Sequence, residues 1–229
     1  MINLFIGIVV IIATIGIYLV AVNVHHKYNY PFTAPVIIST IIVIVILLAC
    51  KLPYDTYMIG GRWINELLGP AVVALAYPLY VNRKTLLKLG TPILVGSLFG
   101  SIGGLVTGII LSKLVGLSDF ITYSLLPKNV TTAVAMDIAE TTGGGTSLAA
   151  VFVMIAGIGG VSISSLVFKV FRVRHSLAKG LGLGSASHAI GTASAMEDNQ
   201  LAGSIGSIAM ILSAVLVSIM TPWMIQLLM

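Results

Sequence analysis

The sequence predicts an all-α integral membrane protein, transporter-like, with about eight hydrophobic passages. The 229-residue chain is 58% hydrophobic and only 8% charged, whereas a soluble domain normally carries about 25% charged residues. Its charges are also segregated: charge-free runs occupy residues 1–26, 28–50, 89–112, 141–168 and 199–229. Each run is long enough for a helix to cross a hydrocarbon core, which takes about 20 residues. The expected environment is the lipid bilayer of the cell membrane, which the chain crosses several times.

The passages follow one another through a single polytopic membrane domain, residues 1–229. The continuous passages are residues 4–22, 34–50, 64–81, 89–114, 146–171 and 201–228. The first is expected to be a membrane helix and not a signal peptide, because no basic residue precedes its long apolar run. The other two passages, residues 120–140 and 178–196, are interrupted by Pro, Gly and polar residues. We expect these two to be discontinuous helices.

Lysine and arginine positions orient the passages. If every passage spans the membrane, one side holds Lys51, Arg62, Lys113, Lys169, Arg172, Arg174 and Lys179, and the other holds Lys27, Arg83, Lys84 and Lys88. Basic residues favour the cytoplasmic side, so both ends of the chain are expected in the cytoplasm. The alternative is that a discontinuous passage is re-entrant, which would change this orientation.

Four glycines recur at every fourth position of the passage at 89–114: Gly96, Gly100, Gly104 and Gly108. On a helix they form one continuous surface, the glycine ridge, which lets another backbone approach closely. Helix packing is its expected role. The alternatives are a sliding surface between two rigid bodies and a contact between subunits of a homo-oligomer.

An internal repeat links the two discontinuous passages. Residues 132–137 (TAVAMD) reappear sixty residues later as residues 192–197 (TASAME). A duplication would have units at about 120–173 and 178–229, and the alternative is chance similarity between alanine-rich segments. Transporters are commonly built from such repeats, with the functional site at the repeat interface.

The discontinuous passages hold most of the polar groups that lie within apolar sequence. Pro127 removes a backbone donor, and Gly184 and Gly191 loosen the second helix. A helix that restarts inside the membrane presents free N–H groups, which attract anions. Helices restarting near Thr132 and Thr192 are expected to aim two such ends at one point. The predicted ligand is a small carboxylate, and the predicted binding residues are Lys128, Asn129, Thr131, Thr132, Ser187, His188 and Thr192.

Three residues are candidates for proton coupling: His188, Asp137 and Glu197. An ionisable group inside the membrane is a functional candidate because placing it there is unfavourable, and imidazole titrates near neutral pH. Other interpretations stay open. Lys128 could extend to the lipid headgroups, His188 could bond a neighbouring carbonyl, and the acids could mark where helices leave the membrane.

Enzymatic and nucleic-acid functions find little support in the sequence. It contains no G-x-S-x-G, P-loop, H-E-x-x-H or G-x-G-x-x-G motif. The single cysteine, Cys50, excludes an internal disulfide, and no Cys/His set has zinc spacing. The net charge of +5 lies in loops, where it reports topology more than nucleic-acid binding. We expect no enzymatic activity, cofactor or metal.

Several stretches resemble one family over most of the chain, from about Pro31 onward. They are residues 69–71 (GPA), 74–80 (ALAYPLY), 124–132 (SLLPKNVTT), 178–181 (AKGL), 186–193 (ASHAIGTA) and Glu197. The sequence resembles the LrgB/CidB family of bacterial membrane proteins, whose plant relatives form part of the plastidial glycolate/glycerate translocator. Asn129 departs from the many relatives that have Ser there, although both side chains can hydrogen-bond an anion.

The resemblance implies three classes of function. The first is transport of pyruvate-, glycolate- or glycerate-like carboxylates beside a small LrgA/CidA-type membrane protein. The second is a holin/antiholin-like pore or regulator of murein hydrolase activity and cell lysis, and the third is a scaffold for an LrgA-like partner. The paired polar interruptions favour transport, whereas the glycine ridge alone would suit a scaffold. The resemblance also implies an antiporter-like fold with crossed, discontinuous helices.

Overall fold

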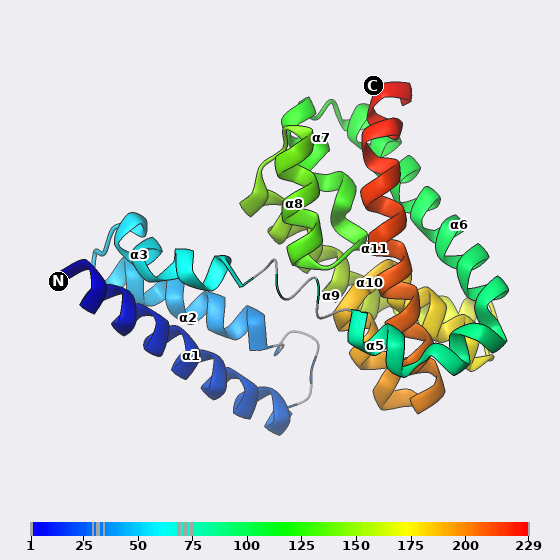
Figure 1. Ribbon diagram of the computed structural model, residues 1–229, viewed down its shortest axis with the longest axis horizontal. Coiled ribbons are helices and arrows are strands. Elements are labelled where there is room, and N and C mark those ends of the chain that lie inside the picture. The colour runs from blue at the N-terminus through cyan, green and yellow to red at the C-terminus, as the bar shows by residue number, and fades with distance from the viewer. Residues whose placement is uncertain are drawn as a thin grey trace. The chain divides into compact units, whose positions relative to one another are not determined.

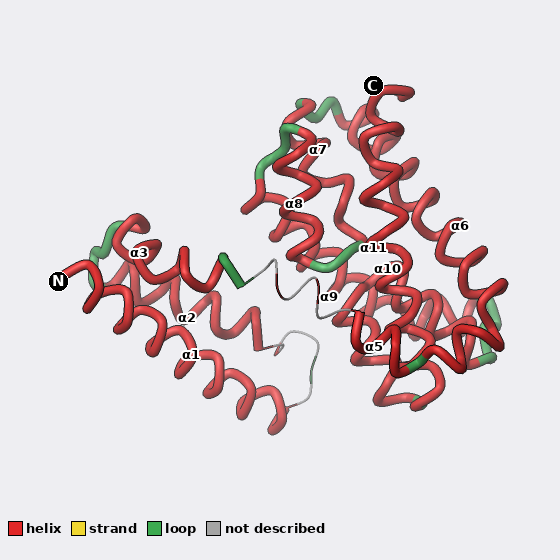
Figure 2. Tube along the Cα trace, viewed as in Figure 1, coloured by secondary structure: helices red, strands yellow, loops and turns green. Residues whose placement is uncertain are grey.

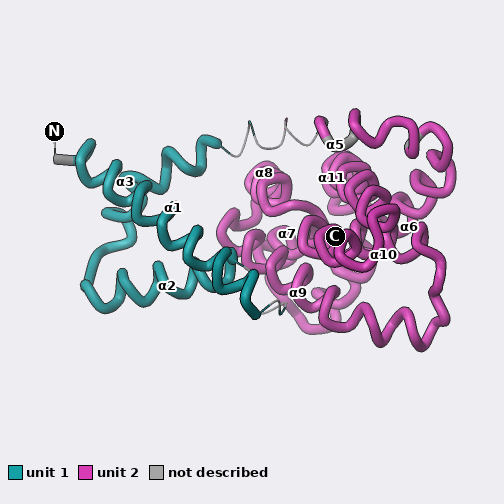
Figure 3. The backbone as a smooth tube through the Cα atoms, turned by 90° about the horizontal axis from the view of Figure 1, so that it is seen from below, with its two compact units in different colours: residues 1–71 teal, residues 72–229 magenta. Residues whose placement is uncertain are grey.

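In a computed structural model of the chain, the described residues are 2–28, 30, 33, 35–67, 70, 73 and 76–228. Helices joined by short loops make up almost all of this part of the chain (Figures 1 and 2). The helices group into two compact units, Met1–Ala71 and Val72–Met229 (Figure 3). Both discontinuous passages lie in the second of these, unit 2.

Unit 1 contains three helices: α1 (Ile2–Tyr28), α2 (Pro35–Ala49) and α3 (Tyr54–Asn65). α1 packs against both of the others. Gly60 of α3 lies so close to α1 that a Cβ there would be 2.6 Å from the carbonyl oxygen of Gly7. Many large apolar side chains of α1 and α2 are nevertheless exposed. Surfaces of this kind require lipid or another apolar partner.

Three long helices form the frame of unit 2: α6 (Arg83–Val115), α9 (Thr146–Val170) and α11 (Gln200–Leu228). The short helix α5 (Ala76–Val81) precedes them. Near its start α6 has one non-helical residue, Leu89, with φ −119° and ψ 18°. Pro92 explains it, because proline removes a backbone donor and clashes with the preceding turn.

The segment between α6 and α9 is a re-entrant hairpin, here named the first hairpin. Its arms are α7 (Asp119–Leu125) and α8 (Thr132–Thr142), and its tip is the 3-10 turn η2 (Leu126–Asn129) with extended Val130 and Thr131. The backbone N–H of Gly145 donates to Ser124 Oγ at 2.8 Å. A Cβ on Gly145 would also lie 2.7 Å from Phe120 Cζ. The segment therefore returns to the end at which it began.

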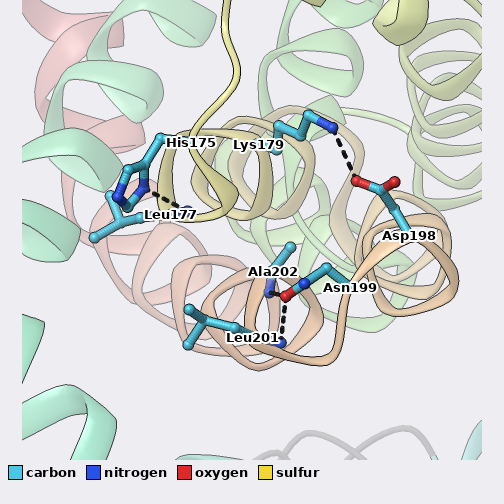
Figure 4. A network of polar contacts seen from close by, with 7 residues as sticks. All are labelled: His175, Leu177, Lys179, Asp198, Asn199, Leu201 and Ala202. Atoms are coloured by element: carbon cyan, nitrogen blue, oxygen red, sulfur yellow. Dashed lines mark hydrogen bonds and ion pairs between the residues drawn. The ribbon is translucent and has the colours of Figure 1, made fainter.

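The helix α10 (Ser176–Asp198) is a second re-entrant hairpin, with arms at 176–186 and 189–198. Only its tip residues leave helical geometry: Ser187 has φ −126° and ψ 15°, and His188 has φ 42° and ψ −128°. Lys179 Nζ and Asp198 Oδ2 are 3.0 Å apart (Figure 4), whereas a straight helix would separate residues this distant in sequence by about 28 Å. Gly191 lies against the Leu183 carbonyl, so the two arms are in contact.

The two hairpins enter unit 2 from opposite ends, because α9 crosses the unit once between them. Ile93 of α6 and Ile205 of α11 belong to one buried apolar cluster, and Leu177 of α10 packs against that cluster. The end where α6, α10 and α11 begin and α9 finishes is named the basic end, after its side chains. The tip turn η2 contacts α6, α9, α10 and α11, which places it in the interior of the unit.

Among the described residues, four helices are long and apolar enough to cross a membrane: Asn3–Tyr28, Leu87–Val115, Thr146–Val170 and Gln200–Leu227. The chain is therefore a multi-pass membrane protein. The expected number of about eight passages counted both hairpins as crossings, whereas each returns to its own end. It also counted α2, whose 15 residues extend only about 22 Å, less than the hydrocarbon core of about 30 Å.

The passage expected at residues 64–81 lies in part outside the described residues. The helix α3 begins earlier, at Tyr54, in a stretch expected to be a loop. Pro53 precedes it in an extended conformation, and Asp55 lies in its first turn, where a negative charge is favourable. These local signals start a helix although its composition is too polar for a membrane passage.

The re-entrant hairpins also change the expected topology. The basic end of unit 2 carries Arg83, Lys84, Lys88, Lys169, Arg172, Arg174 and Lys179, whereas Lys113 lies near the other end of α6. The preference of basic residues for the cytoplasm assigns the basic end to that side. Because α11 begins there and crosses once, this preference now predicts the opposite side for its last residues. The expectation that the C-terminal passage ends in the cytoplasm stays a prediction, and it depends on whether the hairpins cross.

A substitution at Gly184 tests how closely the second hairpin packs on α11. A Cβ at Gly184 would lie 2.8 Å from Cα of Gly206, so Gly184→Ala is expected to lower the free energy of unfolding by about 1–3 kcal/mol. Gly159→Ala on α9 is the matched control, since nothing lies within 4 Å of its Cβ position. That change should be neutral or stabilise by up to about 1 kcal/mol. Thermal unfolding in detergent compares the variants, and equal melting temperatures would contradict the close approach.

Candidate anion site at the hairpin tips

The tip of the first hairpin presents backbone donors that α8 does not use. The first bond within α8 runs from the N–H of Ala135 to the carbonyl of Thr131, at 2.9 Å. The N–H groups before Ala135 have no partner within the helix, and the Thr131 side chain makes no capping bond. A helical first turn of this kind favours an anion.

Lys128 extends from the same tip toward α6. Its Nζ donates to the carbonyl of Gly104 at 3.0 Å, and a Cβ on Gly108 would lie 3.0 Å from it. The side chain is half-buried, and no carboxylate of the described residues forms an ion pair with it. An ammonium group has three donors, so two of them remain for a ligand. Lys128 therefore reaches α6 within its apolar span, Leu87–Val115.

The glycine ridge of α6 is the surface on which the two hairpins meet. From the first hairpin, Lys128 covers Gly108 and Asn129 covers Gly104. From the second hairpin, Ser185 covers Gly100, with its Cβ 3.2 Å from the position that a glycine Cβ would take, and Leu181 covers Gly96. The expected close packing on this ridge is confirmed, and its partners are hairpins of the same chain.

A cavity of about 300 Å³ opens between α6, η2 and the first arm of α10. Its polar side chains are Asn129 from the first hairpin and Ser185 from the second, and Gly96 and Gly100 form part of its wall. Ser185 is the residue that sequence reasoning missed. The available signal was its spacing, because Leu181 and Ser185 are four residues apart and match the spacing of Gly96 and Gly100.

The tip of the second hairpin faces α9. His188 Nε2 forms a 2.9 Å hydrogen bond with the carbonyl of Val153, and because a carbonyl only accepts, this bond requires a proton on Nε2. A Cβ on Gly157 would lie 2.7 Å from that same nitrogen, and Gly160 lies against Ser187 Oγ. His188 thus makes the carbonyl bond that was its alternative interpretation. Its positive φ, rare for a residue with a side chain, is held in place by this bond and by the close approach of α9.

Buried hydroxyl groups without a hydrogen-bond partner occur at several places among the described residues. Four of them lie in sequence near the two tips, on Thr131, Ser185, Ser187 and Thr192, and the others are on α6 (Ser97, Ser101 and Ser112) and α11 (Ser213). A buried hydroxyl left without a partner destabilises a fold by about 1–3 kcal/mol. The four beside the irregular turns are available to bind a ligand.

The predicted residues are only partly brought together. Lys128 and Asn129 face α6, Ser187 and His188 face α9, and Thr192 Oγ1 lies 3.4 Å from the Cβ position of Gly206 on α11. Thr132 begins α8 and is half-buried. The two acids that were candidates for proton coupling, Asp137 and Glu197, are exposed on the second arms of their hairpins.

Comparison with known proteins places these features in a family. A family model described as the LrgB-like family matches residues 14–227. The protein YxaC of Bacillus subtilis is 46% identical over 217 residues, covering 95% of this chain and 94% of YxaC. The holin-like protein CidB of Staphylococcus epidermidis is 37% identical over 221 residues, covering 96% of each chain. CidB of Staphylococcus aureus is 36% identical with the same coverage. No solved structure is significantly similar to this chain.

The positive φ of His188 leads to a prediction about the stability of variants at the second tip. In a regular helix, Ala is more stable than Gly by about 1 kcal/mol. At φ 42° and ψ −128° this order should reverse, because only glycine adopts a positive φ without a steric penalty. We expect His188→Gly to unfold at a higher temperature than His188→Ala, although both lose the bond to Val153.

The control for this comparison is Ala193→Gly in the regular second arm of α10. It should destabilise the protein by about 1 kcal/mol. If His188→Ala were as stable as His188→Gly, the positive φ at position 188 would be contradicted.

Proposed function

We propose that this chain, which belongs to the LrgB-like family, carries small carboxylates across the membrane. The proposal rests on the family membership and on the geometry of the hairpin tips. The observation that carries the proposal is the Lys128 ammonium group, which lies inside unit 2 without a described carboxylate partner. A cation in the interior of a membrane protein is unfavourable unless it is paired. A small anionic substrate would pair with it.

Three neighbouring features suit a carboxylate. The first turn of α8 supplies free N–H groups, the amide of Asn129 and the hydroxyl of Ser185 line one cavity, and Thr131 has a buried hydroxyl without a described partner. The cavity of about 300 Å³ is at the lower end of the usual range for ligand pockets, about 300–1,000 Å³. This size favours pyruvate-, glycolate- or glycerate-like substrates over larger ones.

The internal repeat fits the same proposal. Its two copies, residues 132–137 and 192–197, form the second arms of hairpins that enter unit 2 from opposite ends. Hairpin-plus-helix units that were duplicated and inverted would account for this arrangement, and transporters commonly bind substrate at such a repeat interface. In this proposal the discontinuous helices of the two repeats form one transport site.

Proton coupling would involve His188 first. Its Nε2 proton is engaged by Val153, so Nδ1 is the nitrogen available to take up a proton. Asp137 and Glu197 are exposed and would exchange protons with their surroundings nearer the ends of unit 2. The exposed apolar surfaces of α1 and α2 would suit a small LrgA/CidA-type membrane protein as partner.

The second candidate function is a holin-like pore or a regulator of murein hydrolase activity and cell lysis. The observation that favours it is that relatives 36–37% identical over 96% of the chain are named holin-like protein CidB. A pore would release solutes of many kinds, whereas a carrier would select carboxylates. The two candidates therefore differ in an uptake experiment.

Lys128 provides the first test. Protein in lipid vesicles should take up labelled pyruvate, glycolate or glycerate, measured with and without the LrgA/CidA-type partner and a pH gradient. Lys128→Met keeps the length of the side chain and removes its charge, so uptake should fall about tenfold to over a hundredfold, the effect of losing about 1.5–3 kcal/mol. Lys88→Met, at an exposed lysine of the same helix bundle, should leave uptake unchanged.

Two outcomes would contradict the carrier. Uptake by Lys128→Met at the wild-type rate, in matched amounts of folded protein, would show that Lys128 does not bind the substrate. Leakage of an uncharged dye from wild-type vesicles at the rate of carboxylate flux would favour the pore.

Gly104 provides the second test, because its neighbour Gly103 is an almost ideal control. A Cβ on Gly104 would collide with the Asn129 amide, whereas nothing lies within 4 Å of the Cβ position of Gly103. Gly104→Ala should displace the first tip and reduce uptake at least tenfold, while Gly103→Ala should keep wild-type uptake. Similar uptake by both variants would mean that the position of Asn129 on the ridge does not matter to transport.

A further inference from the structure

A second cavity, of about 470 Å³, lies at the basic end of unit 2. The last turns of α9, the turn into α10 and the base of the second hairpin surround it. Four basic side chains line it: Lys169, Arg172, Arg174 and Lys179. Asp198 is the one acid among the lining residues, so four cations and one carboxylate leave a net charge of +3.

The acid in this cavity is already engaged. Asp198 pairs with Lys179 at 3.0 Å across the base of the second hairpin (Figure 4). Within the described chain, Lys169, Arg172 and Arg174 form no ion pair. Like charges that share one cavity repel each other, so the lining is complementary to an anion that carries more than one acceptor oxygen.

Two of these cations, Arg172 and Arg174, lie in the turn that joins α9 to α10. Arg172 lies in the turn after α9 and has a φ of 54°, a left-handed conformation that residues with a side chain adopt rarely. Three residues later, His175 Nδ1 accepts a bond from the N–H of Leu177 at 3.1 Å and so starts α10 (Figure 4). The turn between these points contains Arg172 and Arg174, which both line the cavity.

The remaining lining identifies the kind of anion. The hydroxyls of Ser165 and Ser194 add donors, and Phe168 and Leu183 add apolar surface. Guanidinium groups match the geometry of phosphate oxygens. Between the lining residues Lys169 and Arg172, the end of α9 and the residue after it expose Val170 and Phe171, whose exposed fractions are 64% and 74%. The helix α9 is long enough to span the membrane. An acyl chain would cover such residues.

We propose that this cavity binds a phosphate group carried by the headgroup of an anionic phospholipid, on the cytoplasmic side of the membrane. Basic pockets between membrane helices on that side recognise such headgroups. The site is separate from the hairpin tips and does not rest on the proposed transport function.

Binding to the full-length protein in detergent tests the proposal. The probes are dioleoylphosphatidylglycerol, dioleoylphosphatidylcholine and inorganic phosphate, and the readouts are lipid adducts in native mass spectrometry and the shift in melting temperature. The double variant Arg172→Gln with Arg174→Gln removes two cavity charges. The control double variant, Lys84→Gln with Lys88→Gln, removes two exposed charges at the same end.

We expect phosphatidylglycerol to bind the wild type and to raise its melting temperature, while phosphatidylcholine and phosphate do neither. Binding should be at least tenfold weaker in the arginine variant and unchanged in the lysine control, with both variants unfolding at the wild-type temperature without lipid. An equal loss of lipid binding in both variants would contradict a specific site, because the general positive charge of this end would then explain the binding. If inorganic phosphate alone raised the melting temperature as much as phosphatidylglycerol does, the cavity would bind free phosphate and the proposed lipid headgroup would be wrong.

Discussion

Irregular backbone inside a membrane protein must be enclosed by protein, because lipid offers no hydrogen bonds to free N–H and carbonyl groups. The two hairpin tips meet this constraint through glycines on the spanning helices. Gly104 and Gly108 of α6 make room for Asn129 and Lys128, and Gly157 of α9 makes room for His188. A methyl group at Gly104 or Gly157 would collide with Asn129 or His188, whereas at Gly108 it would meet the flexible end of Lys128. The positions of Asn129 and His188 therefore depend on a close approach that glycine permits.

Each tip is also tied to a different helix. Lys128 bonds a carbonyl of α6, and His188 bonds a carbonyl of α9. The two hairpins meet on the ridge of α6 and around one cavity, but each has its own anchor and its own end of unit 2. In the proposed carrier, a substrate between the tips would be reached from one end past one hairpin and from the other end past the second. The inverted entry of the hairpins thus suits alternating access.

Much of this arrangement is predictable from sequence, and the part that is not has a physical cause. Pro127 and the polar residues around it predict an interrupted helix, and the spacing of Gly96 to Gly108 predicts a close helix contact. Whether an interrupted passage crosses or returns depends on contacts such as Lys179 with Asp198, which local periodicity does not contain. Ser185 was missed for a related reason, since its role follows from the neighbour that the returning arm gives it. The predicted orientation depends on the same contacts, because it follows from which segments cross.

The packing of the first tip bears on the choice between a carrier and a pore. Leu126 and Val130 flank Lys128 and Asn129 and are almost completely buried, in one cluster with Leu105 of α6 and Val153 of α9. A pore that passes solutes freely needs a continuous hydrated path, and apolar side chains packed at the centre of the unit oppose one. A carrier needs the opposite: a closed centre with a small number of polar groups that engage one substrate at a time. Lys128 and Asn129, set into this apolar cluster, fit the second requirement within one unit. A holin-like pore would have to form either by separating this cluster or between several copies of the chain.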